Sequence, residues 1–290
     1  MKNILLLGGG GYIGVEVGKY FLKKGYNVYC VDNFLYGHSS SVRKLKKEKN
    51  FYLLKYDFTN KKYLKKITKN ISCIIILAGL VGDPITKKYP KIAEKINYSG
   101  IKKFIDFCKK EKQLKKLFFV STCSNYGLIK NKIANEKTEL NPQSLYAKQK
   151  IKIEKYLIKQ NYKFNFSTFI LRFATAFGSS DRPRFDLTVN EFVLMAIQKK
   201  VIDIYDSETW RPYCHINDFA RVIFQLVVKK NNNKKIKIFN VGSNKNNFRK
   251  IDIILKIKKH IPSLKYKDVK SKSDPRNYIV NFNKIKKYLK

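Results

Sequence analysis

A short apolar run at residues 2–8 leads straight into three glycines, Gly8, Gly11 and Gly14. With the spacing G-x-x-G-x-x-G between a strand and a helix, glycines let a pyrophosphate approach backbone amides at the positive end of the helix. Asp32 ends the next apolar run, where a carboxylate can bind the adenosine ribose and would repel a 2′-phosphate. The sequence therefore predicts a dinucleotide site that favours NAD over NADP. The alternative is a glycine turn followed by a surface aspartate.

The first half of the chain alternates short apolar runs with longer amphipathic stretches, which is typical of a parallel sheet flanked by helices. The apolar runs are continuous, which indicates strands buried on both faces. We therefore predict an α/β fold with a Rossmann-type, doubly wound parallel sheet. The predicted strands are 2–8, 27–32, 51–57, 72–79, 116–122 and 166–173, and helices are expected to begin near Gly11, Lys61, Tyr89 and Leu145.

The alternation loosens after residue 173, where loops become longer. Two parts are therefore expected. Residues 1–173 form the dinucleotide-binding domain and include the candidate catalytic residues, and residues 174–290 form a smaller C-terminal substrate-binding lobe that is interleaved with the first part. In this lobe we predict helices near 187–199 and 217–229 and strands near 201–205 and 236–241.

The formal net charge is +41, from 62 lysines and arginines against 21 aspartates and glutamates. Such a charge can serve binding to nucleic acid or to an anionic membrane, but a nucleic-acid surface concentrates its basic residues on one face. Here lysine is distributed from one end of the chain to the other. We therefore expect a solvated basic exterior and neither of these partners.

The five cysteines stand alone, without a Cys-x-x-Cys pair or a histidine-rich neighbourhood. This distribution argues against a disulfide framework and against a metal site, and it favours a reducing compartment. No apolar run approaches the length of a membrane span, and the N-terminus carries no small-residue cleavage site. We therefore expect a cytoplasmic protein.

Tyr146 and Lys150 have the spacing Tyr-x-x-x-Lys, which places both side chains on one face of a helix. This spacing occurs five times in the lysine-rich chain, about as often as chance predicts, so it proves nothing alone. Tyr146 differs from the other four tyrosines because a predicted strand ending in hydroxyl residues, "VSTCSNYG", should pass beside its helix. The sequence therefore identifies Tyr146 and Lys150 as the candidate proton-transfer pair.

Several motifs occur in an order that resembles a known family: "GGGGYIG", "VDNF", "LAGLVGDP", "VSTCSNYG", "SLYAKQK", "LRFATAFG" and "WRPYCHINDFAR". Together they resemble the NAD-dependent sugar-nucleotide epimerase/dehydratase group of the extended short-chain dehydrogenase/reductases. Within that group "LAGL" is similar to UDP-hexose 4-epimerases. The segments "RPRFDLTVNEF" and "DPRNYIV" are similar to a branch that includes GDP-heptose 4-dehydrogenases.

The resemblance implies a catalytic set of Thr122, Tyr146 and Lys150. Tyrosine titrates near pH 10, so a base at neutral pH needs a lowered pKa, and Lys150 together with the oxidised nicotinamide would supply the cations that lower it. Tyr146 would take the proton of a sugar hydroxyl while hydride leaves the same carbon for the cofactor. Thr122 would hydrogen-bond to the reacting oxygen, although packing at a strand end is the alternative reading for that residue.

The resemblance and the motifs also imply the binding residues. The expected cofactor-binding residues are Gly8, Gly11, Tyr12, Ile13, Gly14, Asp32, Asn33, Asp57, Phe58, Leu77, Ala78, Gly79, Asn97, Tyr146 and Lys150. The expected substrate-binding residues are Val81, Gly82, Asp83, Thr122, Cys123, Ser124, Arg182, Arg184, Asn190, Arg211 and Arg276. The alternatives are a helix cap for Asp57 and for Asp83, and surface ion pairs for the arginines.

The function that this resemblance implies is a nucleotide-sugar epimerase that acts at C4 through a 4-keto intermediate, with a UDP- or GDP-linked sugar as substrate. A GDP-heptose-like 4-dehydrogenase or 4-ketoreductase is the main alternative, and a non-catalytic cofactor-sensing or nucleic-acid-binding protein is a remote one. Dehydratases of the group carry Asp and Glu directly after the catalytic Thr, whereas this chain has Cys123 and Ser124, so 4,6-dehydration is not expected. The resemblance also implies a homodimer through helices at about 89–110 and 145–160, and a role in polysaccharide biosynthesis.

Overall fold

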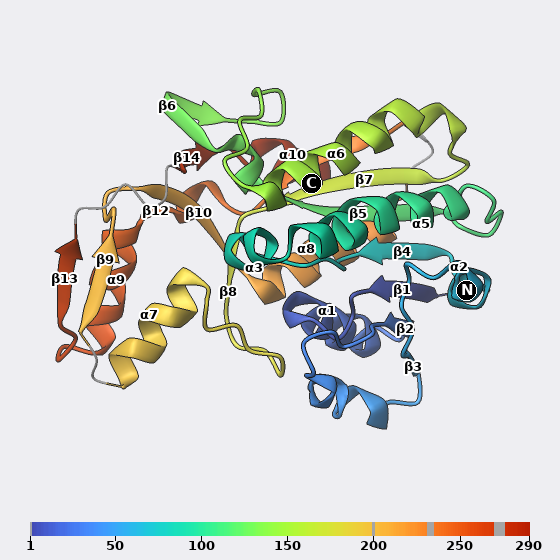
Figure 1. The fold of residues 1–290 in the computed structure, drawn as a ribbon, viewed down its shortest axis with the longest axis horizontal. Coiled ribbons are helices and arrows are strands. Elements are labelled where there is room, and N and C mark those ends of the chain that lie inside the picture. The colour runs from blue at the N-terminus through green and yellow to red at the C-terminus, as the bar shows by residue number, and fades with distance from the viewer. Residues whose placement is uncertain (1, 199–200, 231–234, 270–275) are drawn as a thin grey trace.

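The computed structural model describes residues 2–198, 201–230, 235–269 and 276–290. Its centre is a seven-stranded sheet in the order β11-β7-β5-β4-β1-β2-β3, and each neighbouring pair of strands is parallel (Figure 1). The strands are β1 (Asn3–Leu7), β2 (Asn27–Val31), β3 (Phe51–Leu54), β4 (Cys73–Ile76), β5 (Lys116–Thr122), β7 (Ser167–Phe173) and β11 (Lys237–Val241). This sheet confirms the predicted Rossmann-type fold.

Helices cover both faces of the sheet because successive side chains of each strand point to opposite faces. In β1, Ile4 and Leu6 pack into one apolar cluster with helices α1, α8 and α10. Leu5 and Leu7 pack into a second cluster with α2, α5 and α6. Neither strand face meets water, which is why the sequence runs are continuously apolar. The helices are α1 (Tyr12–Lys23), α2 (Lys61–Thr68), α5 (Ile101–Cys108), α6 (Leu145–Gln160), α8 (Ile216–Val228) and α10 (Asn283–Leu289).

The helix expected to begin near Tyr89 is present, and a separate short helix precedes it. α3 (Asp83–Lys88) follows Gly82, and α4 (Pro90–Ala93) starts after Tyr89, whose backbone is not helical. Proline has no N–H to donate and disfavours a helical residue before it, so Pro90 ends the first helix. A π-helical stretch, Glu94–Gly100, then leads into α5. α4 therefore confirms the predicted start near Tyr89, and α3 starts at Asp83, the residue for which a helix cap was the alternative reading.

The smaller lobe has its own apolar cluster, formed by α7 (Thr188–Ile197), α9 (Lys250–His260) and the parallel pair β9 (Ile202–Tyr205) and β13 (Tyr266–Val269). Figure 1 shows these elements to one side of the main sheet. Two further small sheets, which the sequence analysis did not predict, connect the lobe to the main sheet. They are formed by β8 (Thr175–Phe177), β10 (Trp210–His215) and β12 (Asn247–Arg249), and by β6 (Leu128–Ala134) with β14 (Asn277–Val280).

The elements predicted after residue 173 are present. The predicted helices near 187–199 and 217–229 are α7 and α8, and the predicted strands near 201–205 and 236–241 are β9 and β11. Residue 199, at the end of the first of these ranges, lies outside the described residues.

The chain after residue 173 does not remain in the smaller lobe. β11 pairs with β7 at the edge of the main sheet, and α8 packs on the sheet face that α1 covers. The chain therefore crosses from the lobe to the sheet and back again. Within the described ranges, none of the helices combines the length and the apolar composition needed to cross a membrane.

Candidate active site

The glycine turn brings the start of α1 close to the ends of two strands. Gly8 has a φ of 85°, and a Cβ at this position would lie 2.6 Å from the backbone nitrogen of Ala78. A Cβ on Gly14 would lie 2.4 Å from the carbonyl oxygen of Gly8. Gly11 is the residue before α1, and no side chain there accepts a hydrogen bond from the helix. The first N–H groups of α1 therefore remain available to an anion. This turn fits the backbone cradle that a pyrophosphate requires.

A cavity of about 420 Å³ opens along this turn and the carboxyl ends of the parallel strands. Ligand sites of doubly wound sheets are expected at this edge. Of the predicted cofactor-binding residues, those that line the cavity are Gly8, Gly11, Tyr12, Ile13, Gly14, Asp32, Asn33, Asp57, Phe58, Leu77, Ala78, Gly79, Tyr146 and Lys150. Of the predicted substrate-binding residues, those that line it are Val81, Gly82, Arg182 and Arg184.

Asp32 shapes one end of the cavity. Its Oδ2 accepts a hydrogen bond of 2.9 Å from the backbone N–H of Gly10, and its Oδ1 accepts one of 2.8 Å from Phe34. Burial raises the pKa of Asp32, and the two backbone hydrogen bonds oppose this effect. Phe34 itself has a φ of 52°. The carboxylate therefore holds the glycine turn and the loop after β2 together.

Beyond Asn33, the loop after β2 was not predicted as part of the site. Leu35, Tyr36 and His38 line the cavity, and the guanidinium of Arg182 lies 5.5 Å from the centre of the Tyr36 ring. The signal that could have identified this loop is its position, because it follows a strand whose carboxyl end carries Asp32.

Asp57, at the end of the third predicted strand, also lines the cavity. Its Oδ1 accepts a 2.8 Å hydrogen bond from the N–H of Thr59. The carboxylate therefore both borders the cavity and stabilises the turn that leads toward α2.

Tyr146 and Lys150 reach the cavity from the first turns of α6. The ammonium of Lys150 donates a 2.8 Å hydrogen bond to the carbonyl oxygen of Val120 in β5 and lies 5.6 Å from the centre of the Tyr146 ring. Lys150 is only 2% exposed. Burial lowers the pKa of Lys150 to about 8, and Glu154 acts in the opposite direction. The shared helix face predicted from the sequence is present.

The electrostatics around Tyr146 differ from the expectation. Burial raises the pKa of Tyr146, Arg184 lowers it, and Asp83 raises it further. The sequence predicted Lys150 and the oxidised nicotinamide as the cations that favour the phenolate, and the structure adds Arg184 as a further cation that opposes the effect of burial at this phenol. An arginine 38 positions from Tyr146 could not be paired with it by spacing, because their proximity depends on how the smaller lobe folds back.

The end of β5 carries three predicted residues that are not among those lining the cavity. Thr122 accepts a 3.0 Å hydrogen bond at Oγ1 from the N–H of Ser124, and a hydroxyl that accepts one bond can still donate its hydrogen. Ser124 Oγ lies 3.3 Å from the phenol of Tyr278. Cys123 is 1% exposed, and its Sγ donates to the carbonyl oxygen of Arg172. The Cys123 side chain thus points into the core, so it is not placed to contact substrate as the sequence analysis expected.

Three predicted substrate-binding residues lie outside the cavity lining and contact one another. A carboxylate oxygen of Asp83 lies 2.7 Å from Nη1 of Arg276. Arg211 is buried and donates hydrogen bonds to the carbonyl oxygens of Trp210 and Arg276. Its guanidinium lies 5.1 Å from the centre of the Tyr278 ring. These contacts join α3 to the segment that leads into β14.

Asn190 connects the smaller lobe to the glycine turn. Its Nδ2 donates to the phenol oxygen of Tyr12 at 3.0 Å and to the carbonyl oxygen of Arg184 at 2.9 Å. Its Oδ1 accepts from the N–H of Gly178 at 3.0 Å, and Tyr12 donates to the carbonyl oxygen of the same glycine at 2.7 Å. Asn190 therefore orients Tyr12 and Arg184, both of which line the cavity.

Asn97 acts on the backbone next to the cavity. Its Oδ1 accepts a 2.7 Å hydrogen bond from the N–H of Leu80, and its Nδ2 donates to the carbonyl oxygen of Leu80 at 3.0 Å and to Gln149 at 2.9 Å. The side chain is 1% exposed. Asn97 thereby holds the segment between Gly79 and Val81, although it does not itself line the cavity.

The sequence and the fold both resemble known enzymes. The profile of the "NAD dependent epimerase/dehydratase family" matches residues 4–242. A UDP-glucuronate 4-epimerase from Thermodesulfobacterium geofontis is 29% identical over 229 residues, which cover 76% of this chain and 70% of that protein. A solved Bacillus cereus UDP-glucuronic acid 4-epimerase, in complex with UDP-glucuronic acid and NAD, has a TM-score of 0.89 at 24% identity and covers 99% of this chain and 92% of its own.

A second similar structure is that of an enzyme named for a different activity. The dTDP-glucose 4,6-dehydratase of Bacillus anthracis, in complex with NAD, has a TM-score of 0.86 at 22% identity, with 99% of this chain and 90% of that chain covered. The family resemblance predicted from the motifs is therefore confirmed. Because the family profile spans most of the chain and the glycine turn leaves its backbone open to a pyrophosphate, this chain belongs to the NAD-dependent epimerase/dehydratase family and its cofactor is NAD.

Proposed function

We propose that this protein is a nucleotide-sugar epimerase that inverts C4 through a 4-keto intermediate. The observation that carries the proposal is that Tyr146 and Lys150 line the same cavity as the glycine turn and Asp32. A proton acceptor and the binding site of a hydride acceptor therefore share one space. Oxidation of a secondary alcohol requires both, because the hydroxyl proton and the carbinol hydride leave from adjacent atoms.

The side chains have separate tasks in this reaction. The glycine turn and Asp32 would hold NAD, which when bound would supply the hydride acceptor for C4 and, in its oxidised form, a positive charge in the cavity. Tyr146 takes the proton of the C4 hydroxyl as the carbonyl forms and returns it when the carbonyl is reduced. Thr122 donates a hydrogen bond to the same oxygen. Inversion at C4 requires the 4-keto sugar to rotate within the site, so that the hydride returns to the opposite face of its carbonyl.

The residues after Thr122 support epimerisation over dehydration. Elimination of water needs an acid and a base next to the reacting sugar. Cys123 points into the core, and burial raises the pKa of its thiol well above the usual range. Ser124 has a hydroxyl with no useful acidity at neutral pH. The chain thus lacks, at these two positions, the groups that a 4,6-dehydratase would use.

The substrate class follows from the relatives and from the arginines. The T. geofontis relative and the B. cereus structure are named as UDP-glucuronate 4-epimerases, so we propose a UDP-linked sugar, with a GDP-linked sugar as the alternative. Arg182 and Arg184 line the cavity, and a guanidinium can bind two oxygens of a diphosphate at once. Arg211 and Arg276 are proposed to complete this diphosphate site.

The glycine turn provides a prediction about the cofactor. Gly14→Ala puts a Cβ 2.4 Å from the carbonyl oxygen of Gly8, so the turn must move. We expect the free energy of unfolding to fall by about 1–3 kcal/mol. The Kd for NAD should rise at least about tenfold, which corresponds to about 1.4 kcal/mol. Isothermal titration with NAD and thermal unfolding measure both effects.

Gly18→Ala is the matched control for this prediction. Gly18 lies in the same helix, but the nearest atom to a Cβ at this position is 3.4 Å away, which is ordinary contact. The Gly18→Ala variant should bind NAD as the unchanged protein does. Equal Kd values for NAD in the two variants would show that the turn does not form the pyrophosphate site.

Proton NMR of UDP- and GDP-linked hexoses, hexuronic acids and heptoses, incubated with the protein and a catalytic amount of NAD, tests the proposed function. An epimerase should produce the C4-inverted sugar until the two epimers reach equilibrium, and NADH should not accumulate. A 4-keto sugar formed together with an equal amount of NADH would instead identify a dehydrogenase and would refute the proposal. A keto sugar reduced by added NADH, with no interconversion of the C4 epimers, would identify a ketoreductase.

A further inference from the structure

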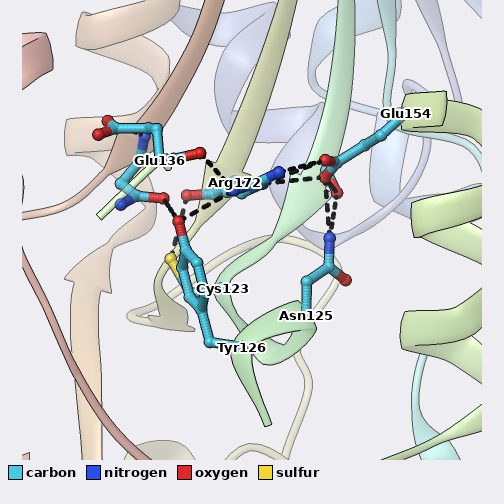
Figure 2. A network of polar contacts seen from close by, with 8 residues as sticks. Cys123, Asn125, Tyr126, Glu136, Glu154 and Arg172 are labelled. Atoms are coloured by element: carbon cyan, nitrogen blue, oxygen red, sulfur yellow. Dashed lines mark hydrogen bonds and ion pairs between the residues drawn. The ribbon is translucent and has the colours of Figure 1, made fainter. Parts of the chain in front are cut away.

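A carboxylate lies in the core directly behind the catalytic pair, and the reaction described above does not use it. Glu154 is 1% exposed, and Arg172 is 4% exposed. Nη2 of Arg172 lies 2.6 Å from Oε2 of Glu154, and Nε donates to the same oxygen at 3.1 Å. Figure 2 shows the two side chains meeting between α6 and β7. A buried ion pair costs desolvation energy, so its position relative to the site calls for an explanation.

The carboxylate has two further donors, both from the end of β5 and the turn after it. Ser121 Oγ donates to Oε1 of Glu154 at 2.5 Å, and Asn125 Nδ2 donates to the same oxygen at 2.8 Å. Arg172 also donates to the phenol oxygen of Tyr126 at 3.1 Å (Figure 2). The carboxylate is therefore held from two strands and a turn, and α6 is attached to β5 and β7 at this point.

Glu154 lies one helical turn after Lys150 and two turns after Tyr146. The side chains of these three residues therefore share one face of α6. On the facing strand the contacts follow consecutively. Val120 accepts the hydrogen bond from Lys150, and the next residue, Ser121, donates to Glu154. Thr122, the proposed catalytic threonine, is the residue directly after Ser121. Any shift of α6 along β5 would break the bonds of Lys150 and Glu154 together and would change where Tyr146 stands relative to that threonine.

We propose that Glu154 is a positioning residue for the catalytic pair: held by Arg172 and Ser121, its carboxylate fixes the register of α6 on β5 and places a negative charge one helical turn from Lys150. This inference rests on the proposed function for the role of Tyr146 and Lys150. The buried ion pair of Glu154 and Arg172 would then position Tyr146 and Lys150 for the reaction, in addition to attaching α6 to the sheet.

The charges around Lys150 define what removal of Glu154 should do. Tyr146 and Glu154 face Lys150 from its own helix, and a backbone carbonyl oxygen faces it from β5. Asp83 of α3 and Arg184 of the smaller lobe act on Tyr146. Burial lowers the pKa of Lys150 to about 8, and Glu154 is the charge that raises it. Without that carboxylate, Lys150 should lose its proton at a lower pH.

The experiment compares the wild-type protein with Glu154→Gln, which removes the carboxylate alone, and with Glu154→Gln/Arg172→Met. The double variant removes both charges, so no unpaired ion is left in the core, and the amide oxygen of the new glutamine could still accept from Ser121. The side-chain titration of Lys150 is followed by NMR of protein labelled with carbon-13 at lysine Cε, with the signal assigned from a Lys150→Arg variant. Most lysines titrate near pH 10.5, which separates the Lys150 signal from the others. The pH profiles of kcat and KM are measured in parallel.

We expect the Lys150 midpoint of Glu154→Gln to fall by about one pH unit. The alkaline limb of kcat should move to lower pH by the same amount, with little change in KM. The midpoint of the double variant should fall less, because loss of the Arg172 cation acts in the opposite direction. Asp218→Asn/Arg221→Gln removes an exposed ion pair on α8. It should leave the Lys150 midpoint and the pH profile of kcat unchanged. A folded Glu154→Gln variant whose Lys150 midpoint matches the wild type would overturn the electrostatic part of the proposal.

Ser121→Ala tests the positioning part and keeps the ion pair, so it also serves if the double variant does not fold. We expect kcat to fall about tenfold, from the loss of a bond worth about 1.5 kcal/mol, with the Lys150 midpoint unmoved. An unchanged kcat would overturn the positioning role. The lysine titration needs neither substrate nor cofactor. If no nucleotide sugar is converted but the midpoint moves as expected, the proposed function fails while the effect of Glu154 on Lys150 stands.

Discussion

Replacing Tyr146 by phenylalanine is expected to lower kcat for the nucleotide sugar by about 1000-fold, within the range that a positioned acid–base group contributes. The ring would remain in the cavity, and only the phenol that exchanges the C4 proton would be lost. KM and the Kd for NAD should change little. Steady-state turnover followed by NMR, together with NAD titration, measures these quantities.

Tyr20→Phe is the matched control, because Tyr20 also has a lysine four residues later and Lys24 lies 5.8 Å from the centre of its ring. That pair lies at the end of α1 and does not line the cavity of the described structure. Its loss should leave kcat unchanged. Turnover by Tyr146→Phe within tenfold of the wild-type rate would exclude Tyr146 as the proton acceptor.

Replacing Arg172 by methionine is expected to produce the largest loss of stability, about 3–5 kcal/mol, because Glu154 would remain charged in the core without its partner. Arg221→Met removes an exposed arginine paired with Asp218 on α8 and should cost less than about 1 kcal/mol. Chemical denaturation followed by circular dichroism measures the free energy of unfolding of both variants.

The double variant Glu154→Gln/Arg172→Met should recover part of this loss, since it leaves no isolated charge. A double variant less stable than Arg172→Met alone would contradict this explanation, because it would mean that Glu154 stabilises the fold without its partner. Wild-type stability in Arg172→Met would show that the carboxylate is satisfied by Ser121 and Asn125 without the guanidinium.

The sheet could be predicted because its strands are marked locally. Runs such as residues 3–7 and 73–76 are apolar on both faces, and each is long enough for one buried strand. The glycine turn could be predicted for a similar reason, since Gly14 is required by its contact with Gly8 within one strand–helix unit, and Gly8 has a φ of 85°. The short helix Asp83–Lys88 was expected only through the alternative reading of Asp83 as a helix cap, although Pro84 in its first turn also marks a helix start.

The sequence by itself determined the sheet, the dinucleotide turn with Asp32, and the Tyr146–Lys150 pair, because each depends on residues within one or two neighbouring elements. Only the tertiary structure decided the direction of Cys123, the proximity of Arg184 to Tyr146, and the ion pair of Glu154. The bond from Asn190 to Tyr12 joins residues 178 positions apart. Such contacts depend on how the smaller lobe returns to the sheet and on which side chains compete for the same buried space, and no local pattern carries that information.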